Sequence, residues 1–333
     1  MAEAVFSVVF AGPLVTCQDA GRPGNMRFGV AASGPMDRLA FAAGNVALGN
    51  PPGQTGIEVS PGGLILHCEA GEVTLAVTGG DFAVEHGPQK LRSWNILTIR
   101  KGERLAIRAG GAGSWAYLAF AGALQTGTWL QSQATHAPSG FGGGRVQSGQ
   151  KLVVANAETR DDRLGDIPRP DFTAQGRITV VIGPQDRHFD PAAVETFLSA
   201  SYTVSDAFDR MGMRLEGPEL RLQAALSIPS EPVVRGAVQV AGDGAPTVLL
   251  ADHQTTGGYP KIATVISSDT DRLAQFRPGD SLRFAAVDAA RATALLRAYL
   301  QDKARYLHDI ATPRGTFAQR LMRENLISGW TAG

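Results

Sequence analysis

The sequence predicts a mainly β protein built from two β-rich domains, with a few short helices at the periphery. The chain has 40 glycines and only 19% charged residues, a balance that suits a turn-rich β chain better than a helical bundle or a disordered chain. Short apolar runs rich in Val, Ile and aromatic residues recur, and many alternate with polar residues. A glycine followed by a polar pair and Leu-x-apolar occurs in KGERLAI (101–107), SGQKLVV (148–154) and PGDSLRF (278–284). This pattern is a tight turn leading into a strand, as in meanders and barrels.

The length of 333 residues allows two domains with sizeable cores. Residues 157–176 are charged, contain two prolines and have little periodicity, so they predict the boundary. We therefore expect an N-terminal β-rich domain over 1–165, a second β-rich domain over 176–290 and a C-terminal helical extension over 291–333.

Nine apolar runs are predicted to be strands because they are short, alternating or rich in β-branched residues. They are FSVVFAG (6–12), GLILHC (63–68), VTLAVTG (73–79), RLAIRAG (104–110), WAYLAFAG (115–122), KLVVAN (151–156), RITVVIG (177–183), AVQVAG (237–242) and SLRFAAV (281–287).

Helices are predicted over Pro35–Leu48, Pro191–Ala200, Ala289–Leu307 and Thr316–Ile327. Ser33 is the candidate N-cap of the first helix, and Asp190 and Asp288 stand in the N-cap position of the second and third. Thr316 and Gln319 form the Thr-x-x-Gln capping box of the fourth.

Composition excludes several classes of protein. Lys plus Arg and Asp plus Glu each number 31, and this zero net charge argues against a general binder of nucleic-acid phosphates. Two cysteines without ligand spacing make no disulfide framework, so we expect a protein of the reducing cytoplasm. The stretch MAEAVFSVVFAG is typical of a first strand rather than of a signal peptide, and no apolar run approaches the ~18 residues of a membrane helix.

Several catalytic motifs are absent from the sequence. It contains no GxxxxGK[ST] phosphate loop, no GxSxG elbow and no HExxH zinc motif. The six histidines show no ligand spacing, so we predict no metal site.

The first of three polar clusters covers Thr16–Asp37, where Asp19 and Arg22 lie among glycines. One interpretation is a glycine loop with an Asp19–Arg22 ion pair. The other is a loop whose N–H groups and Arg22 hold an anion at a helix N-terminus.

The second cluster covers Val204–Leu220 and contains Asp209 and Arg210. Its simplest interpretation is a set of strand-edge salt bridges, each stabilising the fold by only ~0–1 kcal/mol if exposed. The alternative is that Arg210 joins Arg22 in clamping a substrate carboxylate.

The third cluster combines Ser230–Val240 with the link between the apolar runs TVLLA (247–251) and IATVI (262–266). This link is ten residues long, whereas a hairpin needs two to five. In an antiparallel fold these segments meet at one end of a barrel, where a polar loop faces either water or a ligand. If the loop faces a ligand, Gln239, Gln254 and Thr255 are the candidate substrate-binding residues. The catalytic residues would be Thr256, Tyr259 and Asp252, the last as an orienting carboxylate or a base.

These clusters resemble the subunit-2 branch of the allophanate-hydrolase-like, biotin-dependent carboxyltransferase family. The resemblance runs in order from about residue 8 to about residue 288. It rests on QDAGRPG (18–24), SGPMD (33–37), DRMGMRLEGP (209–218), SEPVVRGAVQV (230–240) and QTTGGYPKIATVIS (254–267). The chain departs from the usual family pattern at Phe208-Asp209, at LQSQATH (130–136) and at Ala241.

The resemblance implies a cyclophilin-like β-barrel as the second domain. It also implies substrate-binding roles for Asp19, Arg22, Asp209 and Arg210 in their motifs. The branch includes the C subunit of bacterial 5-oxoprolinase, which works with a KipI-like protein and a LamB/YcsF-like protein to open 5-oxo-L-proline to L-glutamate. ATP, with Mg²⁺, would then act through the complex, and the chain would be inactive without these two partners.

Two alternatives remain open under the same resemblance. One is a carboxyltransferase component of a urea-type carboxylase, which would require biotin carried on another chain. The other is a regulatory antagonist that binds a partner resembling a kinase inhibitor, the KipI-like protein.

Overall fold

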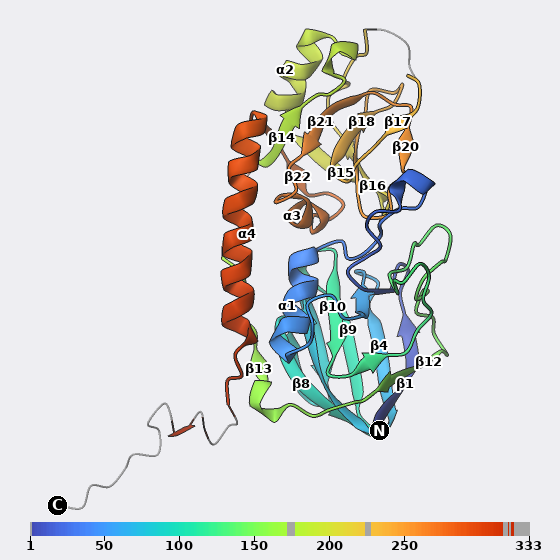
Figure 1. Cartoon of the computed structure of the whole chain (residues 1–333), viewed down its shortest axis with the longest axis vertical. Helices are drawn as coiled ribbons and strands as arrows, with labels where there is room; N and C mark the ends of the chain where they lie inside the picture. The colour runs from blue at the N-terminus through green and yellow to red at the C-terminus, as the bar shows by residue number, and fades with distance from the viewer. Residues whose placement is uncertain (1, 172–176, 224–227, 316–318, 320, 323–333) are drawn as a thin grey trace, which may run out of the picture.

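The computed structural model describes residues 2–171, 177–223, 228–315, 319 and 321–322. Two β-rich domains lie end to end, and a long helix runs along one side of both (Figure 1). The mainly β class predicted from composition and alternation is confirmed.

The first domain is a sandwich of two sheets with a shared core. Alternate side chains in the first part of β1, namely Ala4, Phe6 and Val8, are buried and meet residues of the facing sheet such as Leu75 and Phe120. One sheet has the order β11 (Ala123–Leu124), β12 (Lys151–Ala155), β1 (Glu3–Ala11), β4 (Leu64–Ala70), β9 (Arg104–Ala112), β6 (Asp81–His86) and β7 (Gln89–Arg92). The other has the order β13 (Gly165–Asp166), β8 (Asn95–Arg100), β5 (Glu72–Thr78), β10 (Ala116–Phe120), β3 (Gly56–Val59) and β2 (Thr16–Gln18).

The second domain is a barrel-like sheet of eight strands. Its two edge strands, β22 and β23, are separated in sequence only by Arg283, so the sheet must curl until its edges meet. The order is β22 (Ser281–Leu282), β15 (Tyr202–Phe208), β16 (Gly212–Glu216), β19 (Pro246–Leu249), β18 (Ala237–Val240), β21 (Lys261–Val265), β14 (Ile178–Ile182) and β23 (Phe284–Ala286). A separate ribbon pairs β17 (Glu231–Pro232) with β20 (Thr256–Gly257).

Each of the three longest described helices begins after an aspartate whose side chain caps it. Asp190 caps α2 (Pro191–Ser199) and Asp288 caps α4 (Ala289–Ala311), as predicted, and α4 runs four residues past its expected end. The predicted cap at Ser33 is wrong. Asp37 instead accepts the Ala40 N–H and opens α1 (Arg38–Leu48), because Ser33 adopts a left-handed φ of 53° rather than the extended conformation of an N-cap.

The remaining helices are short: α3 (Thr270–Ala274) and the 3₁₀ turns η1 (Met26–Phe28), η2 (Asp161–Arg163) and η3 (Asp186–His188). The predicted helix over Thr316–Ile327 falls largely outside the described residues. Among the helices that are described, none combines the length and the apolar character needed to cross a membrane.

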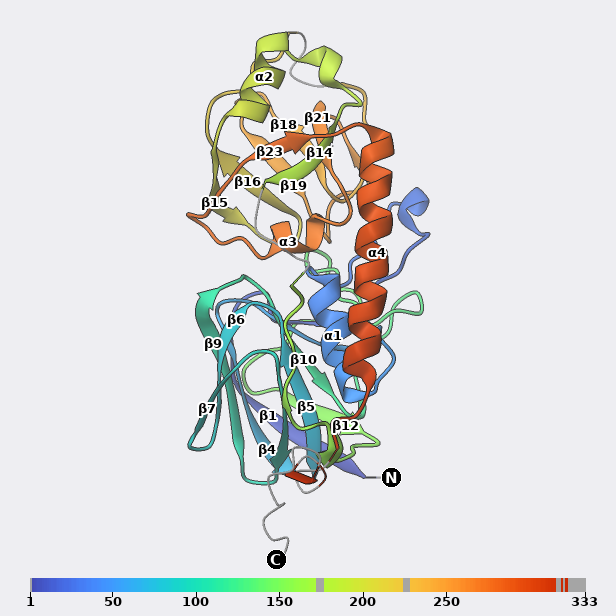
Figure 2. The same ribbon diagram turned by 90° about the vertical axis from the view of Figure 1, so that its left-hand side faces the viewer.

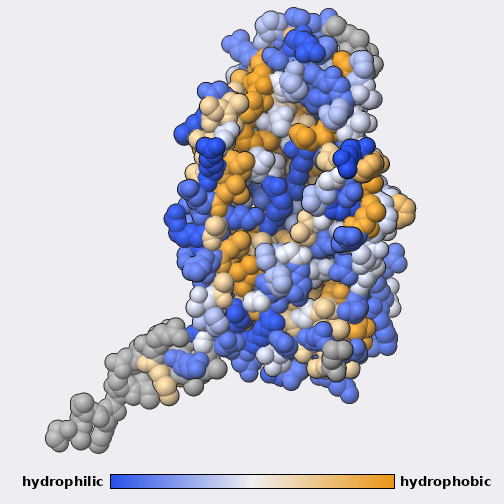
Figure 3. Space-filling model, viewed as in Figure 1, coloured by the Kyte–Doolittle hydropathy of each residue, from blue (hydrophilic) through white to orange (hydrophobic). Residues whose placement is uncertain are grey.

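Polar contacts join the domains beside α1. Arg38 donates through Nε to Asp271 Oδ1 at 2.7 Å, and Gln275 Oε1 accepts the backbone N–H groups of Ser114 and Trp115, each at 3.0 Å. Helix α4 packs against α1 and reaches β14, so it contacts both domains (Figure 2). On the face seen in Figure 3, hydrophilic residues at this level are interspersed with hydrophobic ones. This junction is where the predicted polar segments come together.

Candidate functional site

Four loops meet at the junction of the two domains, and we call this place the loop junction. They are residues 19–36, 130–144, 209–211 and 252–258. The first two loops touch through Asp19, which accepts the Ser132 hydroxyl at 2.7 Å and the Gln133 N–H at 2.6 Å. The loops of the second domain reach them through the Arg210 guanidinium, which donates to Gly34 O at 2.7 Å, and through Asp252, which accepts the Ala137 N–H at 3.0 Å. The polar clusters singled out in the sequence are therefore neighbours in space.

Arg210 lies at the centre of the loop junction. Its side chain is 1% exposed, and it donates through Nε to Asp252 Oδ2 at 2.9 Å and through Nη1 to Glu58 Oε1. With Gly34 O and Asp252 Oδ1 it has acceptors within the protein on all three nitrogens. This geometry joins β3 of the first domain to the second, and a direct contact of Arg210 with substrate stays a prediction.

Arg210, Asp252 and Glu58 form a buried triad of charges. The arginine interacts favourably with both carboxylates. Burial alone would lower the pKa of Arg210, but Asp252 and Glu58 raise it above its usual value. Burial would raise the pKa of Asp252, but the charge and hydrogen bonds of Arg210 hold it below its usual value. Asp252 is therefore an ionised, fixed carboxylate, which suits an orienting group better than a general base.

Glu58 and Tyr117 belong to this site, and the sequence reasoning missed both. Glu58 Oε2 accepts the Met36 N–H at 2.7 Å and the Tyr117 hydroxyl at 3.0 Å, and both side chains are buried. Burial raises the pKa of Glu58 more strongly than Arg210 lowers it. The available signal was a charged residue inside an apolar strand, since a glutamate is rarely fully buried unless it is paired.

Arg22, in the first loop of the loop junction, has buried N–H donors that make no hydrogen bond within the described part of the chain. The residue is 3% exposed, its Nη2 donates to Ala134 O, and its guanidinium carbon lies 4.9 Å from the Trp129 ring centroid. Its Nε and Nη1 are buried without a hydrogen-bond partner. Burial lowers the pKa of Arg22, and the charges of Asp19 and Asp252 offset only part of that effect. An anion accepting from Nε or from Nη1 would satisfy that donor.

Glycine is required where the 130–144 loop approaches Arg22. Gly142 has φ 97°, and a Cβ placed there would lie 2.0 Å from Ala134 O and 3.0 Å from Arg22 Nη2. The close approach of this loop to the arginine therefore depends on the missing side chain.

The carboxylates of Asp19 and Asp209 accept hydrogen bonds from backbone N–H groups in the structure. No Asp19–Arg22 ion pair within 4.0 Å occurs in the described part of the chain, and Asp19 Oδ1 also accepts the Gly21 N–H at 2.8 Å. Asp209 is exposed, and its Oδ1 accepts the N–H groups of Met211 and Gly212 at 2.7 and 3.2 Å, which shapes the turn before β16. Their predicted contacts with substrate remain predictions.

The barrel end carries a second polar cluster under the β17–β20 ribbon. Gln254 Nε2 donates to Gln239 Oε1 at 3.0 Å, and Gln185 Nε2 donates to Glu231 Oε2 at 2.6 Å. Lys261 pairs across the strands with Gln239, and its Nζ lies 3.6 Å from Glu231 Oε2. Gln239 Nε2 and Lys261 Nζ are buried without a hydrogen-bond partner. Lys261 was not among the predicted site residues, although it ends the polar link.

The link between β19 and β21 is more than a turn. Its residues Thr256 and Gly257 form β20, and Thr255 O accepts the Val233 N–H at 3.1 Å. Thr256 and Tyr259 are exposed, Thr255 is half-buried, and Asp252 lies in the triad. A Cβ on Gly257 would lie 2.5 Å from Gln239 Nε2, so the ribbon packs directly on the barrel-end cluster. Exposed polar groups are thus carried on a loop anchored at both ends.

No group of three or more His, Cys, Asp or Glu side chains that could hold a metal ion occurs among the residues the structure describes.

Comparisons with known proteins agree on one family. Residues 28–286 match the model of the carboxyltransferase domain, subdomain A and B. The chain is 34% identical to the C subunit of 5-oxoprolinase of Haemophilus influenzae, over 85% of this chain and 91% of that protein. It is 30% identical to the protein of the same name in Escherichia coli, over 92% and 98% of the two chains.

Larger proteins contain a similar segment. The chain is 29% identical to "Urea amidolyase" of Saccharomyces cerevisiae over 83% of its own length, but it spans only 16% of that protein. The solved structure of the K. lactis urea amidolyase has a TM-score of 0.81 and 23% identity, covering 92% of this chain and 20% of that one. At 23% sequence identity, this structural similarity shows that the two proteins share a fold.

Proposed function

The chain belongs to the family of carboxyltransferase domains built from subdomains A and B, and from this premise we propose that it is the C subunit of an ATP-dependent 5-oxoprolinase. Together with a KipI-like and a LamB/YcsF-like partner it would hydrolyse 5-oxo-L-proline to L-glutamate. The observation that carries this proposal is the match in length. The chain covers 91% and 98% of two proteins named for this role, but only 16% of a urea amidolyase.

The loop junction supports the proposal through its chemistry. The substrate 5-oxoproline carries a carboxylate beside a lactam ring. Arg22 has two buried donors without a hydrogen-bond partner, Nε and Nη1, and either can donate a charge-assisted hydrogen bond to a carboxylate oxygen. We assign Arg22 to binding the substrate carboxylate.

The link 252–258 and Tyr259 would form the rim of the same site. In this proposal Gln254, Thr255, Thr256 and Tyr259 face the ligand, while Asp252 orients Arg210 and the 130–144 loop. The depressed pKa of Asp252 makes this orienting role the better one for its carboxylate.

The energy source is ATP, which we place in the complex and not in this chain. The sequence has no phosphate loop, and we assign none of the described side chains to Mg²⁺–ATP. None of the binding and orienting roles proposed above for residues of this chain involves contact with ATP.

A carboxyltransferase component of a urea-type carboxylase is the second candidate. It is favoured by the 29% identity to a urea amidolyase over most of this chain. The biotin would then come from another chain.

The test is reconstitution of the complex. The chain is purified together with its KipI-like and LamB/YcsF-like partners, and formation of L-glutamate from 5-oxo-L-proline is measured with ATP and Mg²⁺. Each of the three proteins is left out in turn, and a parallel reaction supplies urea, bicarbonate and a biotinylated carrier. We expect glutamate only when all three proteins are present.

Three outcomes would contradict the proposal. Undiminished glutamate formation without this chain would show that the complex does not require it. Carboxylation of urea without lactam hydrolysis would support the second candidate. Tight binding to the KipI-like partner with no turnover in the full mixture would indicate a regulatory antagonist.

A further inference from the structure

A cavity of about 460 Å³ lies between the two domains beside α4. Its walls come from α1, α3 and α4 and from the segments around Trp94 and Thr179, and none of its lining residues belongs to the four loops of the loop junction. A volume of this size is typical of a small-molecule site. The cavity is therefore a candidate for a ligand that the proposed function does not use.

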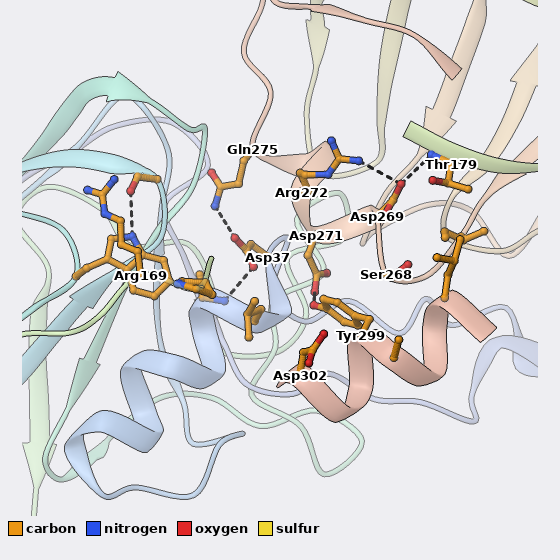
Figure 4. Close-up of a pocket in the computed structure, with 18 residues that line it drawn as sticks. Asp37, Arg169, Thr179, Ser268, Asp269, Asp271, Arg272, Gln275, Tyr299 and Asp302 are labelled. Atoms are coloured by element: carbon orange, nitrogen blue, oxygen red, sulfur yellow. Dashed lines mark hydrogen bonds and ion pairs between the residues drawn. The ribbon is translucent and has the colours of Figure 1, made fainter. Parts of the chain in front are cut away.

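The walls combine apolar and aromatic surface with carboxylates. Leu39, Leu295 and Ala298 contribute aliphatic surface, and Trp94 and Tyr299 contribute rings. Asp37, Asp271 and Asp302 project toward the same space from three helical segments (Figure 4). Such a lining suits a compact molecule with an apolar body and one charged end.

Each of the two wall arginines has an aspartate partner. Arg169 Nη2 lies 3.0 Å from Asp81 Oδ1, and Arg272 Nη2 lies 3.2 Å from Asp269 Oδ2. Asp271 is likewise paired, with Arg38 Nε at 2.7 Å. Asp81 also pairs with Arg92, so the charge of Arg169 is only partly compensated, but both wall arginines already have a carboxylate partner.

Asp37 differs from Asp269 and Asp271 because its hydrogen-bond partners are uncharged. It accepts only neutral donors, the Ala40 N–H at 2.9 Å and Gln275 Nε2 at 2.8 Å, and no ion pair to it within 4.0 Å occurs among the described residues. The charges of Lys303 and Arg38 interact with that of Asp37 only at longer range. A buried carboxylate without a cation beside it is costly, so a ligand cation would compensate it.

We propose that this interdomain cavity binds a small organic ammonium compound, with its cation at Asp37 and its apolar body against Trp94, Tyr299 and the α4 wall. Aromatic faces add attraction for a cation. Such a ligand would touch both domains and α4 at once. It would also contact the start of a hydrogen-bonded path, because the Asp37 N–H donates to the Tyr117 hydroxyl at 2.6 Å and Tyr117 reaches the Arg210 triad through Glu58.

The test is calorimetric titration of the whole chain with benzylamine, using benzyl alcohol as a neutral probe of nearly the same shape. We expect saturable binding of benzylamine and at least tenfold weaker binding of benzyl alcohol. Asp37→Asn should remove this preference, and asparagine keeps the N-cap of α1, so the fold should be retained. Ala298→Trp should abolish binding of both probes by filling the cavity, whereas Asp309→Asn, at an exposed position on the same helix, should change nothing.

The proposal is overturned if benzylamine shows no saturable binding to the wild-type chain. It is also overturned if benzyl alcohol binds equally well, or if Asp37→Asn with an unchanged melting temperature binds benzylamine as the wild type does. Because no outcome depends on lactam hydrolysis, the result is independent of the proposed function.

Discussion

Arg210 is the residue on which the contact between the two domains at the loop junction depends. Its removal would leave Glu58 and Asp252 buried without their cation, and breaking a buried ion pair in this way costs about 3–5 kcal/mol. We expect Arg210→Met to lower the free energy of unfolding by that amount in urea denaturation. The matched control is Arg214→Met, whose pair with Asp243 is solvent-exposed and should contribute at most about 1 kcal/mol. Equal, small losses in both variants would show that the triad does not stabilise the junction.

Arg22 is expected to act on the substrate and not on the fold. In the reconstituted complex, Arg22→Ala should lower kcat/KM for 5-oxoproline by about 10–150-fold, which corresponds to the ~1.5–3 kcal/mol of a charged hydrogen bond. Arg22→Lys should restore little, because a lysine lacks the planar fork. Arg27→Ala, at an exposed position on the same loop, is the control. Normal kinetics in both Arg22 variants would contradict its assignment.

The sequence predicted polar residues of this site but not their partners. Asp19, Arg22, Arg210 and Asp252 are recognisable because they interrupt apolar runs or lie among glycines. Glu58 was missed because its partner Arg210 lies 152 positions further along the chain, and such long-range pairing is set by the packing of the domains.

Among the elements, α1 joins the domain interface through its N-cap, and this makes stability depend on pH. Burial, and then the nearby charge of Asp271, raise the pKa of Asp37 to about 6, compared with an ordinary value of 3.8. The folded chain therefore binds the proton more tightly than the unfolded chain. The resulting stabilisation is complete below about pH 4 and is lost as the pH rises through 6.

We therefore expect the wild type to lose stability relative to Asp37→Asn between about pH 4.5 and 7, by on the order of 1–3 kcal/mol. The measurement is urea denaturation of both chains at several pH values, and the difference between the chains cancels the titration of other groups. A stability difference that does not vary with pH would contradict the assignment of the titration to Asp37.

Strands and helices were predictable where local signals were strong. The period-2 alternation of β1 and the aspartate caps of α2 and α4 depend on neighbouring residues and were predicted correctly. The start of α1 was not, because Ser33 and Asp37 both satisfy the residue preference of an N-cap, and only the backbone conformation distinguishes them. The β17–β20 ribbon also escaped prediction, since two-residue strands have no periodicity.

At the scale of the whole molecule, the mainly β class followed from composition, whereas the order of the strands did not. The barrel closes because β22 and β23, consecutive in the chain, end on opposite edges of one sheet, and β14 pairs with β23 from more than 100 residues away. The loop junction and the interdomain cavity both result from docking one domain on the other. Neither was predictable from segments considered separately.

The proposed site can be located by a crystal structure of the complex with the KipI-like partner and 5-oxo-L-proline. We expect the substrate carboxylate within hydrogen-bonding distance of Arg22 Nε or Nη1, with the lactam ring facing residues 254–259. Substrate density far from the loop junction, with Arg22 still unpartnered, would contradict this assignment of the site.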